Sequence, residues 1–323
     1  MNKKSKLKMG IIGVGRMGQY HLNVLSGLNT HQLVGVFDSN QDRSMELASK
    51  FETKSYSDYL KLLEDVEAIT IAVPTHLHYE ISKKALEYDC HVLLEKPMTT
   101  KLEEAVELQK IAKSKKKIIQ VGHVERFNGA VIELQKIVTD PYLIEARRFS
   151  PFTPRIKDTG VILDMLIHDL DIVLNLVKYP VTSFTAMGSY IENENFEDIA
   201  SLQLCFENGC IATLVGSRVS QNKERIMNIT QEKSYIMLNY ANQDIEIHRQ
   251  ASGAVLTTKE EIKYSQESFV EKLYVHKDNP LKSQHIHFYE CITDNVTPLV
   301  PEEKDIETLR IALESIDKIK AQK

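Results

Sequence analysis

Short apolar runs alternate with amphipathic segments through the first 123 residues of the chain. The runs are mostly aliphatic, as expected of strands buried on both faces of a parallel sheet. The segments between them carry apolar residues at helical spacing, for example Ala105, Leu108 and Ala112. This alternation predicts βαβ units. The predicted strands are residues 9–14, 33–37, 68–73, 92–94 and 118–121.

The pattern changes after Gly122. Residues 130–138 and 161–177 have helical patterns, and the apolar runs that follow alternate with polar residues at a period of two, which is typical of strands with one buried face. Two more helical patterns, 281–294 and 302–319, close the chain. The other predicted strands are residues 142–149, 201–206, 210–215, 226–230 and 235–238.

These two patterns predict an α/β protein with two domains. Residues 1–123 are expected to form a Rossmann domain with a doubly wound parallel sheet, and residues 124–323 an α+β domain with a mostly antiparallel open sheet. We expect the second domain to bind the substrate and to mediate oligomerisation, because an open sheet leaves one face to be covered. The expected assembly is a homodimer or homotetramer. The last helix is expected either to stay with the second domain or to pack back on the first.

Composition excludes several classes of protein. The chain has 323 residues, with 40 Lys and Arg against 45 Asp and Glu, and this mildly acidic balance offers no footprint for nucleic acid or an anionic membrane. No apolar run reaches the roughly 20 residues that span a bilayer, and we recognise no signal peptide. The four cysteines show no CxxC spacing, so we expect reduced thiols and a cytoplasmic location. We predict no metal site, because neither His76 with His78 nor His285 with His287 has partners at zinc spacing.

A glycine motif lies between the first predicted strand and the first helix. Gly13, Gly15 and Gly18 fit GxGxxG, and an acidic residue, Asp38, ends the second strand 20 residues after Gly18. The first glycine permits a tight turn, the second lets the backbone approach a pyrophosphate, and the third lets helix and strand pack closely. Asp38 would accept hydrogen bonds from the adenosine ribose and repel a 2′-phosphate. The predicted cofactor is therefore NAD rather than NADP.

Two further strand ends carry candidate site residues, because ligands of open α/β sheets bind at the carboxyl ends of the strands. Pro74, Thr75 and His78 follow the third predicted strand, and we expect His78 to contact the cofactor or to cap the next helix. Glu95 and Lys96 follow the fourth. A lysine directly before a proline is held in an extended or turn conformation, and a cis bond would aim its amine into the cleft. From spacing alone, a surface position explains Lys96 equally well.

One predicted helix of the second domain carries a polar stripe on an otherwise apolar surface. Asp164, His168 and Asp171 recur at i, i+4 and i+7 in residues 161–177, so all three are expected on one face. Burial without partners costs roughly a few kcal/mol for each group, so they must find partners or face a cleft. Two explanations stay open: an internal hydrogen-bond network, or an active site with His168 as acid or base, since histidine titrates near neutrality.

These motifs and a few neighbouring residues form one pattern along the chain. Its residues are Gly13-Val14-Gly15-Arg16-Met17-Gly18 with His21, residues 74–78, Glu95-Lys96-Pro97, Gly122-His123 with Arg126-Phe127, and Asp164 with His168. The pattern resembles the glucose-fructose oxidoreductase/inositol dehydrogenase/MocA family over essentially the full chain. The combination of Lys96 with Asp164 and His168 is specific, whereas many unrelated enzymes share the glycine motif.

The resemblance implies an NAD-dependent dehydrogenase that acts on a secondary alcohol of a sugar. In that family the lysine and the helix histidine flank the hydroxyl that is oxidised. Lys96, Asp164 and His168 are therefore the expected catalytic residues, and they are also expected to bind the substrate. The expected cofactor contacts are Gly13, Gly15, Arg16, Met17, Gly18, Asp38, Pro74, Thr75, His78, Glu95 and Lys96.

Within the family, the chain looks most like the nucleotide-sugar branch. That branch oxidises the 3-hydroxyl of UDP-N-acetylglucosamine or of its uronic acid, and a partner aminotransferase then aminates the keto product on the way to diamino sugars of lipid A. Arg155, in a basic loop with Arg147 and Arg148 upstream, is expected either to contact a UDP phosphate or to be a surface arginine. The segments that carry this likeness are residues 122–128, 147–155 and 163–171.

Two departures from the family pattern concern the shape of the substrate pocket rather than the reaction. Asp158-Thr159-Gly160 stands where the family has a glycine cluster, and no glycine separates Asp164 from His168.

Three other functions fit the same motifs. The scaffold could oxidise a free cyclitol or monosaccharide such as an inositol, it could run in reverse as a keto-sugar reductase, or it could be a regulator that senses NAD and a sugar without chemistry. Retention of Lys96 and His168 argues against the regulator, because a sensor needs neither proton transfer nor hydride alignment.

Overall fold

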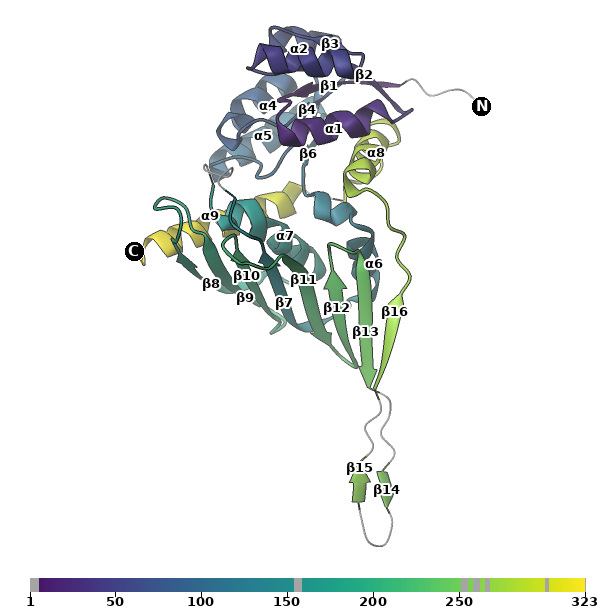
Figure 1. Cartoon of the computed structure of the whole chain (residues 1–323), viewed down its shortest axis with the longest axis vertical. Coiled ribbons are helices and arrows are strands. Elements are labelled where there is room, and N and C mark those ends of the chain that lie inside the picture. The colour runs from purple at the N-terminus through teal and green to yellow at the C-terminus, as the bar shows by residue number, and fades with distance from the viewer. Residues whose placement is uncertain are drawn as a thin grey trace. The chain divides into compact units, whose positions relative to one another are not determined.

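The chain folds into two units that share its C-terminal segment. The first unit comprises Met1–Phe127 and Asn279–Leu313, and the second comprises Asn128–Asp278 and Glu314–Lys323. The chain thus returns to its N-terminal unit at Asn279 and re-enters the second unit at Glu314 (Figure 1). The structure is a computed structural model, and it describes residues 6–153, 159–250, 255–257, 262–264, 268–299 and 302–322.

A six-stranded parallel sheet forms the centre of the first unit. Its strands lie in the order β3-β2-β1-β4-β5-β6, and every neighbouring pair is parallel. All six carboxyl ends therefore lie at one edge of the sheet. This confirms the predicted Rossmann sheet apart from β3, a two-residue strand that the apolar pattern did not predict. The strands are β1 (Leu7–Ile12), β2 (His31–Phe37), β3 (Lys54–Ser55), β4 (Ala68–Ile71), β5 (His91–Leu94) and β6 (Ile119–Val121).

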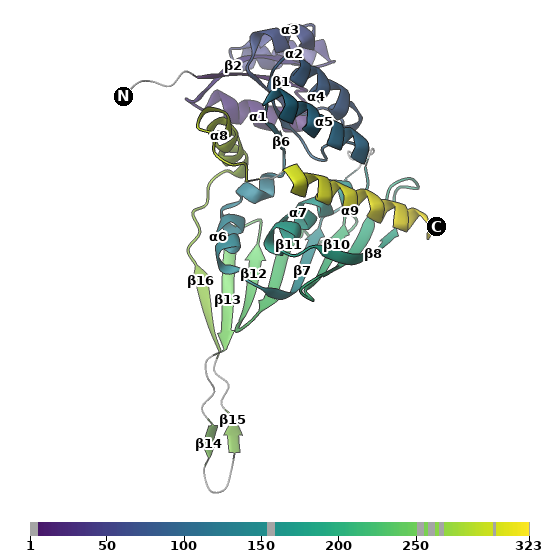
Figure 2. The ribbon, with the colours of Figure 1, turned by 180° about the vertical axis from the view of Figure 1, so that it is seen from behind.

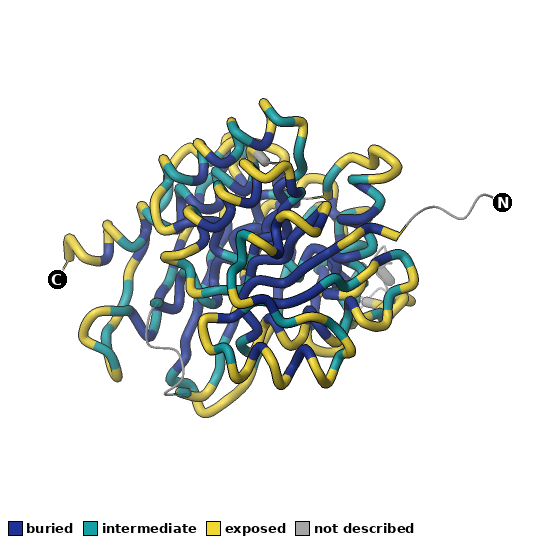
Figure 3. Tube along the Cα trace, turned by 90° about the horizontal axis from the view of Figure 1, so that it is seen from above, coloured by how far each residue is buried: buried dark blue, intermediate teal, exposed yellow. Residues whose placement is uncertain are grey.

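Helices cover both faces of this sheet and enclose a separate apolar core on each. One core packs α3, α4, α5 and the beginning of α9 on strand residues such as Ile69 and Leu94, and the other packs α1, α2 and α8 on alternate residues such as Met9 and Leu93. Both sets are buried, which explains the continuous aliphatic runs (Figure 3). The helices are α1 (Arg16–Ser26), α2 (Gln41–Lys50), α3 (Tyr59–Asp65), α4 (His78–Glu87), α5 (Leu102–Lys115), α8 (Pro280–Thr293) and α9 (Glu302–Lys320), with short 3₁₀ turns η1 (Thr75–Leu77) and η2 (Val124–Phe127).

An eight-stranded sheet forms the second unit, in the order β16-β13-β12-β11-β7-β10-β9-β8. β7 and β10 pair in parallel, and every other neighbouring pair is antiparallel, which confirms the predicted mostly antiparallel sheet. The pattern did not predict β8, β13 and β16. The strands are β7 (Pro141–Phe149), β8 (Val181–Ser189), β9 (Ile199–Phe206), β10 (Ile211–Ser217), β11 (Glu224–Gln231), β12 (Ser234–Asn239), β13 (Asp244–Gln250) and β16 (Ser268–Leu273), and a separate pair is formed by β14 (Val255–Thr257) and β15 (Ile262–Tyr264).

Two helices, α6 (Gly129–Ile137) and α7 (Ile167–Leu176), cover one face of this sheet (Figure 2). A π-helical turn, η3 (Ile162–Leu166), leads directly into α7, so the predicted helix at 161–177 is present with an unusual first turn. Gly216 in β10 leaves room for this turn, because a Cβ there would lie 2.7 Å from Leu166 Cγ. No helix in the described part of the chain combines the length and apolarity needed to cross a membrane.

A buried ion pair fixes α7 to the sheet. Arg148 Nε lies 2.7 Å from Asp169 Oδ2, Arg148 Nη2 lies 3.0 Å from Asp169 Oδ1, and the two side chains are 3% and 0% exposed. The guanidinium also lies over the ring of Tyr240. Arg147 and Arg148 both belong to β7, which confirms the strand predicted at residues 142–149. Neighbouring residues of a strand point to opposite faces, so Arg147 is exposed and pairs with Glu224 while Arg148 is buried.

The two adjacent arginines allow a matched stability test. Arg148→Met should lower the free energy of unfolding by about 3–5 kcal/mol, because it leaves the Asp169 carboxylate buried without its partner. Arg147→Met should cost less than about 1 kcal/mol, since its pair with Glu224 is exposed to water. Urea unfolding of both variants measures the difference. Equal losses would show that the buried pair does not hold α7 to the sheet.

Candidate active site

The glycine motif forms the loop between β1 and α1, and Gly13 and Gly18 are each required by a close approach of the backbone. Gly13 has φ +87°, and a Cβ there would collide with the carbonyl group of Ala72. A Cβ on Gly18 would collide with the carbonyl oxygen of Gly13. Gly15 is the N-cap of α1 without a side-chain cap, and no atom lies within 4 Å of the place a Cβ would take. The start of α1 is thus open to an anion, and the loop fits the pyrophosphate of a dinucleotide.

Asp38 holds this loop from the end of β2. Its Oδ2 accepts a hydrogen bond from the Val14 N–H at 2.8 Å, and its Oδ1 accepts one from the Asn40 N–H at 2.8 Å. Each carboxylate oxygen keeps lone-pair capacity for a ribose hydroxyl. Arg16 and Met17, on the first turn of α1, are exposed. The residues therefore fit NAD, with Asp38 available to the ribose.

His78 joins the ends of β4 and β5. Its ring is 1% exposed, with Nε2 3.0 Å from the Val73 carbonyl oxygen and Nδ1 2.8 Å from the Pro97 carbonyl oxygen. Burial lowers the pKa of His78, so a neutral ring donates to one of these carbonyls at a time. Pro74 and Thr75 lie at the start of η1, exposed and half-buried respectively. Whether these three residues touch the cofactor stays a prediction.

Glu95 and Lys96 follow β5, and both side chains are partly exposed. The bond between Lys96 and Pro97 is cis. Glu95 Oε1 lies 2.8 Å from His21 Nε2, and Gly122 leaves room for this carboxylate, since a Cβ there would lie 3.3 Å from Oε1. Burial alone would raise the pKa of Glu95, but the hydrogen bond from His21 and the positive charge of Lys96 hold that pKa below its usual value. A carboxylate and an ammonium thus stand on consecutive residues at this strand end.

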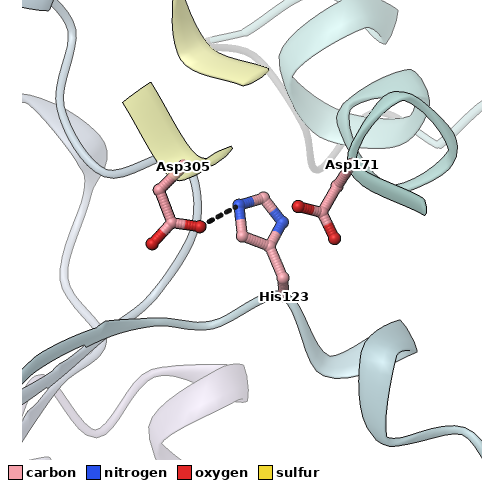
Figure 4. A group of neighbouring side chains, drawn as sticks. All are labelled: His123, Asp171 and Asp305. Atoms are coloured by element: carbon pink, nitrogen blue, oxygen red, sulfur yellow. Dashed lines mark ion pairs between the residues drawn. The ribbon is translucent and has the colours of Figure 1, made fainter. Parts of the chain in front are cut away.

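The last strand of this edge leads to a second histidine–carboxylate pair. His123 follows β6, and its Nε2 lies 3.6 Å from Oδ1 of Asp305 in α9 (Figure 4, which also draws Asp171 of the second unit). Both side chains are buried. The pair connects the beginning of α9 to the end of β6 within the first unit.

In the second unit the predicted polar stripe divides. Asp164 lies on the π turn and His168 on the first turn of α7, and both are partly exposed, whereas Asp171 is buried at 1%. Asp164 and His168 are therefore accessible from solvent on a helix whose other side chains are mostly buried. Arg155 and Asp158 lie outside the described residues.

A carboxylate at the N-terminus of this helix holds it in place. Glu197 accepts a hydrogen bond from the Ile162 N–H at 3.0 Å, and burial raises the pKa of its carboxyl group despite that bond. Gly160 is required here, because a Cβ would collide with the Glu197 carboxylate. Beside it, Arg218 donates to Asp198 Oδ1 at 2.7 Å and to the Thr159 carbonyl oxygen at 2.6 Å.

Sequence reasoning missed these supporting residues. The sequence assigned Arg148 and Asp169 no supporting role. The groups that Glu197 and Arg218 bond are far away in sequence or belong to the backbone. Gly160 precedes the helix, but no sequence pattern indicates that the Glu197 carboxylate occupies the space beside it. His285 Nε2 lies 2.8 Å from His21 Nδ1, a contact between distant segments that no local pattern indicates.

The fold and the glycine loop define a dinucleotide-binding oxidoreductase, and comparisons with known proteins agree. Residues 7–123 match the oxidoreductase family with an NAD-binding Rossmann fold, and residues 128–237 match the GFO/IDH/MocA C-terminal domain. The chain belongs to the GFO/IDH/MocA family and is an NAD-dependent dehydrogenase.

Two curated relatives and one solved structure illustrate the range of the family. The chain is 32% identical over 250 residues to UDP-N-acetylglucosamine 3-dehydrogenase of Acidithiobacillus ferrooxidans, covering 77% of this chain and 79% of that protein. A solved structure of the enzyme with that name from the same organism has a TM-score of 0.90 at 28% identity, with 98% of this chain and 99% of that chain covered. The chain is also 28% identical over 233 residues to scyllo-inositol 2-dehydrogenase (NAD(+)) of Bacillus subtilis, covering 67% of this chain and 68% of that protein.

The Asp38 carboxylate offers a direct test of the cofactor site. Asp38→Ala should weaken NAD binding by about tenfold or more, because it removes a charged hydrogen-bond acceptor, and it should narrow the preference for NAD over NADP. Asp42→Ala, an exposed acidic residue on α2, is the matched control and should leave both affinities unchanged. Calorimetric titration with each dinucleotide measures both effects. An unchanged preference in Asp38→Ala would contradict the ribose assignment.

Proposed function

We propose that this protein oxidises the 3-hydroxyl of UDP-N-acetylglucosamine with NAD and yields the 3-keto nucleotide sugar. The observation that supports the substrate best is the similarity to the Acidithiobacillus ferrooxidans enzyme, which extends through both units in sequence and in fold. The observation that supports the chemistry is that a partly exposed Lys96 at a strand end and a partly exposed His168 on an otherwise buried helix occur in one dehydrogenase.

His168 is the proposed general base. Oxidation of a secondary alcohol releases a proton from the hydroxyl, and an imidazole titrates in the range where it can accept that proton at neutral pH. Asp164 lies one turn before His168 and orients or electrostatically tunes it. Lys96 donates a hydrogen bond to the same hydroxyl oxygen and so keeps the reacting carbon in line for hydride transfer. Bound NAD supplies the hydride acceptor.

The proposal extends to the nucleotide and to the product. Arg155 is the proposed diphosphate contact, because a guanidinium binds phosphate oxygens in pairs. An aminotransferase is the proposed consumer of the keto product, on a route to diamino sugars of the lipid A type. The proposed setting is a cytoplasmic homodimer or homotetramer, and the four free cysteines are compatible with a reducing compartment.

A free cyclitol is the second candidate substrate. The similarity to scyllo-inositol 2-dehydrogenase of Bacillus subtilis and to myo-inositol 2-dehydrogenase of Thermotoga maritima, at 28% and 27% identity, favours it. The same Lys96 and His168 would serve an inositol hydroxyl, or a keto sugar in the reductive direction. A regulator without chemistry would need neither residue.

A substrate comparison tests the proposed function. Purified protein with NAD should form NADH with UDP-N-acetylglucosamine, and formation should be slower with UDP-glucose and with myo-inositol, because these lack the N-acetyl group or the nucleotide. Absorbance of reduced nicotinamide follows the reaction, with a keto-trapping amine present to pull the equilibrium. Faster turnover of myo-inositol would favour the cyclitol dehydrogenase, and no NADH from any of the three would favour the regulator.

The role of His168 is tested by substitution. His168→Ala should lower kcat by about 10²–10⁴-fold, the range typical of a lost general base, and should leave the Kd for NAD unchanged. Asn175→Ala is the matched control, since Asn175 lies on the same helix and donates its side-chain N–H only along it, to the Asp171 carbonyl oxygen at 2.6 Å. Normal turnover in His168→Ala would remove this residue from the mechanism.

A further inference from the structure

Three side chains that are distant in sequence form a continuous hydrogen-bonded array in the first unit. Glu95 Oε1 lies 2.8 Å from His21 Nε2, and His21 Nδ1 lies 2.8 Å from His285 Nε2. His21 is on α1 and His285 is on α8, and the Glu95, His21 and His285 side chains are 11%, 1% and 0% exposed. The array thus begins beside Lys96 and ends in the apolar core that α1 and α8 share.

Counting donors and acceptors fixes the direction of these hydrogen bonds. Glu95 is ionised and can only accept, so His21 Nε2 carries a proton and donates it. His285 Nδ1 has no hydrogen-bond partner among the described residues. A proton on that atom would be a buried N–H without an acceptor, so a neutral His285 carries its proton on Nε2 and donates to His21 Nδ1.

The surrounding groups favour this arrangement. Burial lowers the pKa of His285 well below its usual value, so the ring stays neutral. On the other side, Lys96 and His78 act electrostatically on Glu95. The ring centroids of His31 and His285 lie 6.1 Å apart. Burial lowers the pKa of His31 to about 4, so above that pH the His31 ring is uncharged.

The Tyr289 ring packs beside His31, with the two ring centroids 5.5 Å apart. In this arrangement of donors and acceptors the array carries one negative charge, on Glu95, and two donated protons point toward it.

We propose that His285 and His21 are positioning residues that fix the Glu95 carboxylate beside Lys96 and so hold the Lys96 ammonium in the orientation that hydride transfer requires. The inference rests on the role of Lys96 in the proposed function. It adds that α8 controls the reaction through the hydrogen bond between His285 and His21, which lie 264 residues apart in sequence. A free carboxylate could rotate away from Lys96, whereas one that accepts from His21 cannot do so without breaking a charge-assisted hydrogen bond.

The state of the array can be measured without any substrate. In apo protein labelled with ¹⁵N-histidine at pH 8.5, the imidazole shifts of His21 and His285 should both report the Nε2–H tautomer, because Glu95 accepts from His21 Nε2 and His285 Nε2 donates to His21 Nδ1. His285→Gln should keep this tautomer at His21, since a glutamine amide can donate from nearly the same place. His285→Leu should lose it. An imidazolium or an Nδ1–H tautomer at His21 in the wild type would overturn the proposed array of hydrogen bonds, whatever the substrate is.

The link to the reaction is measured in the same variants. His285→Leu should lower kcat by roughly tenfold, the loss expected of one buried hydrogen bond, with KM for NAD within about twofold of wild type. His285→Gln should recover most of the kcat. The matched control is His287→Leu, since His287 lies on the same helix and bonds Leu299 N–H and Cys291 instead of His21. It should keep the wild-type kcat.

The outcomes separate this inference from the proposed function. If the tautomers are as expected and the wild type turns over none of the tested sugars, the proposed function is wrong but the hydrogen bonds of the array are confirmed. If the wild type is active and His285→Leu has the same kcat, the positioning role is overturned. A loss that His285→Gln does not recover, or that His287→Leu reproduces, would show that α8 acts through packing alone and would also overturn it.

Discussion

Six parallel strands end at one edge of a sheet, and this constraint determines where every candidate residue of the first unit lies. Each loop at that edge is bonded to its neighbour. Asp38 after β2 accepts the Val14 N–H after β1, and the His78 ring bridges the carbonyls of Val73 and Pro97 after β4 and β5. The loop that contains Gly13 and the loop that contains Lys96 therefore lie at one edge whose loops are joined by hydrogen bonds.

In the second unit, Asp164 and His168 are partly exposed on a helix whose other side chains are mostly buried. Glu197 caps the π turn, and the Arg148–Asp169 pair holds α7 against the sheet, so the helix is fixed at both its beginning and its side. Asp164 and His168 keep partial exposure while Asp171 is buried. The proposed general base on such a support would lose little conformational freedom when substrate binds, which is the condition for an orientation effect in catalysis.

Much of this could be predicted from sequence, and the exceptions have physical reasons. The parallel strands were predictable because both of their faces are buried, and the glycine motif because its steric demands are local. Two adjacent arginines, in contrast, look alike in sequence, and only the phase of β7 decides that Arg148 is buried and Arg147 exposed. The bond between His21 and His285 joins residues 264 positions apart, so no local pattern can indicate it.

Transfer of hydrogen from the substrate to the cofactor tests the central claim most directly. UDP-N-acetylglucosamine deuterated at C3 is incubated with the protein and NAD, and the reduced nicotinamide is analysed by mass spectrometry and NMR. The proposed reaction predicts that one deuterium appears at C4 of the nicotinamide for each keto sugar formed, and that turnover is slower than with the unlabelled substrate. NADH without deuterium, or a keto sugar that still carries the deuterium at C3, would contradict oxidation at the 3-hydroxyl.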